Sequence, residues 1–108
     1  MNLSTTVPLL HDLIRELEAA GDSSLSDVVN GTAGANDTDL EAFLRSNELW
    51  GGAGSIADQA AVSAPREIRR RVESALINLG REQMRLEVKN PRTDSWVEVF
   101  SEWQRQGI

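Results

Sequence analysis

The spacing of apolar residues is the feature that most constrains the fold of this chain, because it follows the period of an α-helix almost throughout. The first run has members at offsets of one, four, five and eight, which places them on one helix face: Leu9, Leu10, Leu13, Ile14 and Leu17. No segment alternates apolar and polar residues for long enough to predict a β-strand. The sequence therefore predicts an all-α fold, a small irregular bundle of four to six helices that forms a single domain over residues 1–108.

Capping signals and helix breakers set the expected bounds in the N-terminal part of the chain. Asn30-Gly31 is expected to stop a short helix, and residues 31–37 are expected to form a flexible surface loop. Thr38 followed by Glu41 is a capping-box pattern, which predicts that the threonine caps the next helix.

The longest predicted helix starts near Pro65 and is ended by Pro91, because proline removes a backbone donor and restricts the residue before it. Its apolar stripe is interrupted by Gln83. Glu67 and Arg71 have the spacing and order of a favourable helical ion pair, which contributes about 0.2–0.5 kcal/mol.

The chain lacks the side chains on which most catalytic and metal-binding sites depend. Its 108 residues include no cysteine and no tyrosine, and His11 is its single histidine. The absence of cysteine excludes disulfides, thiolate zinc sites, iron–sulfur clusters and a cysteine nucleophile. His11 is expected on the solvated side of the first helix. We therefore expect no catalytic residues, no metal ligands and no cofactor.

The N-terminal residues and the lengths of the apolar runs indicate where in the cell the protein is expected. Residues 1–8 contain no basic segment, and no stretch approaches the roughly 18 apolar residues that a membrane span needs. We expect a cytoplasmic protein that does not engage a membrane.

Charge is distributed unevenly along the chain. Residues 1–62 contain ten acids against Arg15 and Arg45, a formal charge of −8, whereas residues 63–108 carry +2 and the whole chain carries −6. Two interpretations stay open. Either the acidic part packs beside the basic helix with ion pairs between them, or its surface steers and binds a basic protein partner.

Four arginines open the longest predicted helix: Arg66, Arg69, Arg70 and Arg71. The helix macrodipole opposes cations at this end. The chain also has a pI near 4.7, which disfavours binding to the phosphate backbone of a nucleic acid. We expect no nucleic-acid partner, and a local anion site stays open.

The most distinctive segment is the run Gly51-Gly52-Ala53-Gly54 between Trp50 and Ser55. Glycine loses more backbone entropy on folding than other residues, so such a run needs a steric or functional reason. It could be a tight turn that joins two helices with Trp50 in the core, or a loop whose free N–H groups and Ser55 hydroxyl hold an anion. The lysine of a phosphate-binding P-loop is missing. The candidate binding residues are Asn47, Glu48, Trp50, Gly52, Gly54, Ser55, Asp58, Arg66 and Arg69.

This segment resembles the centre of a family of short bacterial proteins that form a domain of unknown function. The residues that carry the resemblance are Ser46-Asn47-Glu48-Leu49-Trp50-Gly51-Gly52-Ala53-Gly54-Ser55-Ile56-Ala57-Asp58. A weaker similarity extends to the first helix, ending at Gly21, and to the tail from Asn90 to Trp103. The family has no established activity, so the resemblance implies relatives and no reaction.

Aromatic residues near the C-terminus have helical spacing: Trp96, Phe100 and Trp103. We expect them to anchor the core, and one left exposed would mark a docking site for a partner. The apolar stripes of the last two helices could also serve a homodimer.

These features favour a non-enzymatic protein-interaction module that binds a basic partner through its acidic N-terminal part. Small acidic bacterial proteins often neutralise toxins, so an immunity- or antitoxin-type inhibitor is the most concrete form of this hypothesis. The alternative is a small-ligand or anion-binding domain that uses the glycine-rich loop 50–58. A third possibility is an enzyme that uses Asp58 or Glu48 as a base.

Overall fold

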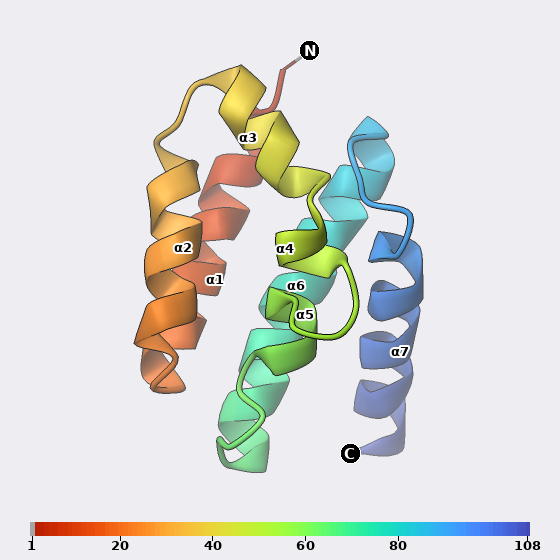
Figure 1. Ribbon diagram of the computed structural model, residues 1–108. Coiled ribbons are helices and arrows are strands. Elements are labelled where there is room, and N and C mark those ends of the chain that lie inside the picture. Colours follow the sequence, from red (N-terminus) through yellow and green to blue (C-terminus); the bar gives the residue numbers. More distant parts are fainter. Residues whose placement is uncertain (1) are drawn as a thin grey trace.

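The computed structural model describes residues 2–108, and all regular structure in that range is helical (Figure 1). A 3₁₀ turn, η1 (Ser4–Thr6), precedes the first α-helix. The α-helices are α1 (Val7–Ala19), α2 (Ser23–Ala33), α3 (Asp37–Leu44), α4 (Asn47–Trp50), α5 (Ile56–Gln59), α6 (Arg66–Leu86) and α7 (Thr93–Gln106). The predicted all-α bundle is therefore confirmed, with two helices only one turn long.

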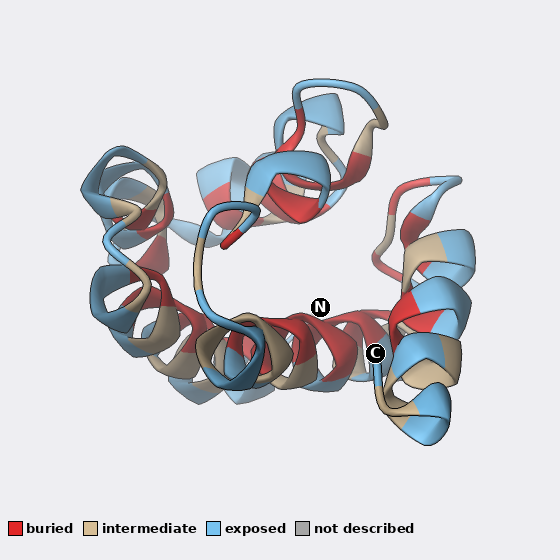
Figure 2. Ribbon diagram, turned by 90° about the horizontal axis from the view of Figure 1, so that it is seen from below, coloured by how far each residue is buried: buried red, intermediate tan, exposed pale blue. Residues whose placement is uncertain are grey.

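The longest helix, α6, is the centre of the arrangement. It packs against α1 on one side and α7 on the other, and α2 covers the outer side of α1. In Figure 1, α2 and α7 lie at opposite sides of the molecule, α3 lies at the top beside the upper end of α1, and α4 and α5 lie in front of α6. Figure 2 shows the buried residues along the inner faces of these helices and the exposed residues outside. None of the helices in residues 2–108 is long and apolar enough to span a bilayer.

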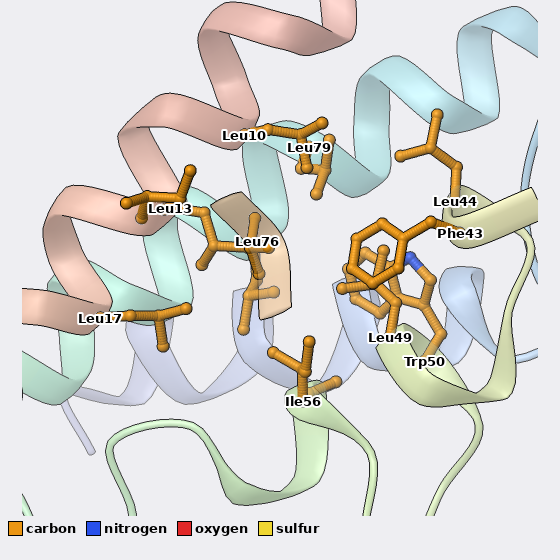
Figure 3. Close-up of a cluster of buried hydrophobic side chains, with 14 of the residues drawn as sticks. Leu10, Leu13, Leu17, Phe43, Leu44, Leu49, Trp50, Ile56, Leu76 and Leu79 are labelled. Atoms are coloured by element: carbon orange, nitrogen blue, oxygen red, sulfur yellow. The ribbon is translucent and has the colours of Figure 1, made fainter. Parts of the chain in front are cut away.

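The hydrophobic core is built from leucines of α1 and α6 and is closed by the short helices. Figure 3 shows side chains from α3, α4 and α5 meeting those of α1 and α6. The core residues labelled there are Leu10, Leu13, Leu17, Phe43, Leu44, Leu49, Trp50, Ile56, Leu76 and Leu79. The short segments between α3 and α6 therefore complete the core, although their local periodicity is weak.

Helix α2 corrects the prediction of a flexible loop over residues 31–37. The helix continues through Gly31 to Ala33, and α3 already begins at Asp37. Val29 and Ala33 are buried one turn apart, and this packing offsets the roughly 1 kcal/mol that a helical glycine costs relative to alanine. The cap of α3 is also corrected, because Asn36 and not Thr38 accepts the hydrogen bond, from the Asp39 N–H at 2.9 Å.

The end of α6 and its expected ion pair differ from the prediction. The helix ends at Leu86, because Glu87 takes a left-handed conformation with φ of 59° and turns the chain toward the fully buried Val88. Arg71 does not pair with Glu67. Its Nε and Nη2 instead donate to the two carboxylate oxygens of Glu16 in α1, at 2.8 and 3.0 Å.

Candidate functional site

The glycine-rich segment places Trp50, the last residue of α4, inside the core (Figure 3). Trp50 is fully buried, and its Nε1–H donates to Oε1 of Gln83 at 3.0 Å. Gln83 donates through Nε2 to the carbonyls of Leu44 and Val88, at 2.8 and 2.9 Å. Trp96 of α7 donates through Nε1 to the Trp50 carbonyl at 3.0 Å. The polar residue that interrupts the α6 stripe is therefore the centre of a buried hydrogen-bond network.

Two glycines of the segment adopt backbone conformations that other residues rarely take. Gly52 has a φ of 100° and Gly54 a φ of 85°, both in the left-handed region. A Cβ on Gly52 would also lie 3.3 Å from Nη1 of Arg92, so the arginine passes close over the turn. The run of glycines thus has the geometry of a tight turn.

Ser55 and Asp58 close this turn on itself. The Ser55 Oγ caps α5 by accepting from the Asp58 N–H at 3.2 Å, and Oδ2 of Asp58 accepts from the Gly54 N–H at 3.0 Å. Ser55 is buried, so its hydroxyl does not face solvent. The Gly54 N–H and the Ser55 Oγ, two groups that would hold an anion in this loop, are therefore already bonded within the turn. The geometry favours a structural role for the turn.

Three other candidate residues line no common cavity with Asp58 and Arg69. The Oδ1 of Asn47 accepts from Nδ2 of Asn90 at 2.9 Å, and Nδ2 also reaches the Arg45 carbonyl at 3.0 Å, which ties α4 to the α6–α7 connection. Glu48 is exposed on α4, and Arg66 is exposed at the start of α6. Asn47 therefore has a structural partner, and these residues do not converge on one site.

The structure does bring together Asp58 and Arg69. Both line a cavity of about 220 Å³ where α5 meets α6 and α7. The remaining walls are mostly apolar and aromatic: Ala57, Ala60, Val62, Val72, Glu73, Leu76, Trp96, Phe100 and Trp103. Ligand sites are mostly apolar concavities with a few polar groups, so this cavity is the candidate binding site.

Glu73 is the unusual residue of the cavity. It is only 3% exposed, and its Oε1 is buried and accepts no hydrogen bond from residues 2–108. Burial raises the pKa of Glu73 above the usual value of 4.5, while the guanidinium groups of Arg69 and Arg70 act in the opposite direction. Nε of Arg69 lies 3.6 Å from Oε2 of Glu73, which is beyond hydrogen-bond distance. A buried carboxylate with an unused oxygen and a raised pKa is typical of functional sites.

The sequence reasoning missed Glu73 and assigned the aromatic residues to the core. Glu73 precedes the buried Leu76 and Ile77 by three and four positions, so a helical projection would have placed it on the buried face. Of the aromatic residues, Phe100 is buried, Trp96 is half-buried and packs against the core, and Trp103 remains 36% exposed. The core prediction is therefore right for Phe100, and Trp103 is the exposed aromatic that would mark a contact surface.

A second notable feature is a stretch of chain that carries only negative charge. Residues 16–44, from the end of α1 to the end of α3, contain no lysine or arginine, and their carboxylates belong to Glu16, Glu18, Asp22, Asp27, Asp37, Asp39 and Glu41. The Oδ2 of Asp22 accepts from the Ala61 N–H at 2.6 Å. Glu41 pairs with Arg45 at 3.1 Å. Glu16 pairs with Arg71, and this is the one ion pair in residues 2–108 that joins the acidic part to the rest.

The other four carboxylates of this stretch form what we call the acidic surface: Glu18, Asp27, Asp37 and Asp39. All four are exposed, and no lysine or arginine of the described chain lies within ion-pair distance of them. The interpretation in which the basic helix neutralises the acidic part therefore holds for Glu16 alone.

Positive charge gathers elsewhere in the fold. A groove of about 450 Å³ between α6 and α7 is lined by Arg70, Arg81 and Arg105, together with serine, asparagine and glutamine side chains. Helix α7, which forms one side of this groove, lies at the opposite side of the molecule from α2 (Figure 1). His, Asp and Glu side chains within residues 2–108 form no group of three that could hold a metal ion.

Comparisons of the chain with protein-family models, with curated protein sequences and with solved structures found no match. The resemblance of residues 46–58 to a bacterial family therefore stays a prediction.

Proposed function

We propose that the protein is a binding module that engages a basic protein through its acidic surface. The observation that carries this proposal is the exposure of four carboxylates, on α1, α2 and α3, without an intrachain cation. Like charges that are left unneutralised repel one another, and a partner of opposite charge removes this repulsion while steering the encounter. Val28 on α2, which follows Asp27 in the sequence, is 36% exposed and offers an apolar contact.

Within this class, an immunity- or antitoxin-type inhibitor acting in the cytoplasm is the most concrete role. A small domain with concentrated negative charge on one face can cover the basic cleft of a toxin, and charged interfaces of this kind associate rapidly. A basic protein encoded by a neighbouring gene is the natural first partner to test.

The proposal is tested by a comparison of two double variants with equal net charge. Asp27→Asn with Asp37→Asn removes two charges from the acidic surface, and Glu67→Gln with Glu98→Gln removes two exposed charges from α6 and α7. Binding of a fluorescein-labelled oligolysine is measured by anisotropy at low salt. Each exposed ion pair contributes about 0.2–1 kcal/mol, so the first variant is expected to weaken binding by between about twofold and thirtyfold.

The second variant serves as the matched control and is expected to bind nearly as the wild type does. Binding should also weaken as the ionic strength rises to physiological values, where the Debye length is about 8 Å. Equal losses in both variants would show that oligolysine responds to net charge alone, and would contradict the proposal.

A further inference from the structure

The cavity between α5, α6 and α7 has a wall of three aromatic rings. The ring centroids of Trp96 and Phe100 are 5.3 Å apart and stacked, and those of Phe100 and Trp103 are 5.7 Å apart in an edge-on arrangement. Val62 and Trp103, which also line the cavity, are 70% and 36% exposed. The cavity is thus open to solvent beside Val62 and Trp103.

The residues that line the cavity carry two carboxylates and one guanidinium, and Arg70, outside the lining, also acts on Glu73. Asp58 and Glu73 are carboxylates, and Arg69 is the one guanidinium among the lining residues. Nε of Arg69 lies 3.6 Å from Oε2 of Glu73, and both this Nε and Oε1 of Glu73 are buried with no hydrogen-bond partner in residues 2–108. A buried acceptor without a partner is costly, so a donor that reaches Oε1 is strongly favoured.

We propose that this cavity binds a small organic ammonium ion, whose N–H group donates to Oε1 of Glu73 and whose apolar body lies against Trp96, Phe100 and Trp103. Burial of the apolar body against these rings is favoured by the hydrophobic effect, and the carboxylate balances the charge of the ammonium group. This site is distinct from the acidic surface and does not depend on the proposed protein partner.

The size of the cavity limits the ligand. A cavity of roughly 150 Å³ holds a benzene molecule, and this one measures about 220 Å³. A single ring with a short ammonium chain therefore fits, whereas a nucleotide or a folded peptide does not. Benzylammonium is the probe of choice, with benzyl alcohol as its neutral counterpart and phenylacetate as an anionic one.

The three tryptophans report on the cavity with a built-in control. In a protein labelled with ¹⁵N, each indole N–H gives its own NMR signal. Trp96 and Trp103 line the cavity, while Trp50 does not and donates its N–H to Gln83. Titration with benzylammonium is expected to shift the signals of Trp96 and Trp103 and to leave that of Trp50 in place.

Variants identify the group that recognises the cation. Glu73→Gln keeps the size of the side chain and removes its charge, and we expect it to weaken benzylammonium binding by about tenfold or more. Glu98→Gln, at an exposed position of α7 outside the cavity, is the matched control and should leave the affinity unchanged. Trp103→Ala changes a partly exposed residue, so it tests the aromatic wall without removing core packing, and it should also weaken binding.

Three results would overturn the proposal. The first is the absence of indole shifts at millimolar benzylammonium. The second is an order of affinities that does not favour the cation. Tighter binding of phenylacetate than of benzylammonium would make Arg69 the recognising group, and equal binding of benzyl alcohol would show that charge plays no part. The third is an unchanged affinity in a folded Glu73→Gln protein.

Discussion

The substitution Gln83→Leu tests the buried hydrogen-bond network directly. Leucine has a similar volume and is apolar, so the change removes hydrogen bonds without opening a large cavity. Three groups then lose their partner inside the core: the Nε1–H of Trp50 and the carbonyls of Leu44 and Val88. All three residues have no exposed side-chain surface, so water does not replace the lost bonds without local opening.

The expected magnitude follows from these three groups. A buried polar group left without a partner costs about 1–3 kcal/mol. At about 1–2 kcal/mol each, the three groups would cost about 3–6 kcal/mol, and the easier burial of leucine offsets part of this cost. The free energy of unfolding is therefore expected to fall by about 2–4 kcal/mol. The stability of a whole domain is about 5–15 kcal/mol, so the variant should still fold. Its melting temperature should fall by about 8–16 °C, at roughly 4 °C per kcal/mol.

Urea unfolding monitored by tryptophan fluorescence measures the change, with Trp50→Phe and the double variant completing a thermodynamic cycle. Because the two side chains share one hydrogen bond, the double variant should be more stable than the sum of the single changes predicts, by about 1 kcal/mol. Surface substitutions without structural effect usually change the free energy of unfolding by less than about 0.5 kcal/mol. A Gln83→Leu protein whose free energy of unfolding lies within about 0.5 kcal/mol of the wild-type value would therefore refute the reasoning.

Further substitutions test packing and charge. Gly80→Ala puts a Cβ 2.4 Å from Cγ2 of Val97 and should destabilise the protein by about 1–3 kcal/mol. Gly31→Ala, where a Cβ would meet open space on α2, should stabilise the protein by about 0.5–1 kcal/mol. Thermal unfolding measures both changes. Because burial raises the pKa of Glu73, the contribution of this residue to stability should be lost as the pH rises above 4.5. Urea unfolding should therefore show Glu73→Gln more stable than the wild type at pH 7 but not below pH 4. Hydrogen bonds from Arg85 and Thr5 hold the pKa of Glu82 at about 2, so its contribution should be present above pH 4.5 and be lost toward pH 2, a dependence that Glu82→Gln should remove.

The parts of the fold that could be predicted are those with a repeated apolar pattern. The stripe of α1 and the start of the long helix at Pro65 are both visible in residue spacing alone. The continuation of helix α2 through Gly31 could not be predicted, because the burial of Val29 and Ala33 outweighs the helix-breaking tendency of the glycine. The cap at Asn36 was missed because Thr38 matches the same pattern two residues later.

The candidate site shows the same division. The burial of Trp50 is one of the two alternatives that the local sequence leaves open, and the structure shows it. The partners of Gln83 and the surroundings of Glu73 depend on segments far apart in the chain, which no local pattern connects. A charged or amide side chain within an apolar stripe was the available signal, because burial of such a group requires a partner or a function.

The most direct test of the proposed function is to map where a basic partner binds. Backbone amide NMR signals are followed while unlabelled oligolysine is added at low salt. The largest shifts are expected within residues 16–44, around Glu18, Asp27, Asp37 and Asp39, with α7 unaffected. Shifts that are spread evenly over the molecule, or that are centred on α6 and α7, would contradict the proposal that the partner binds the acidic surface.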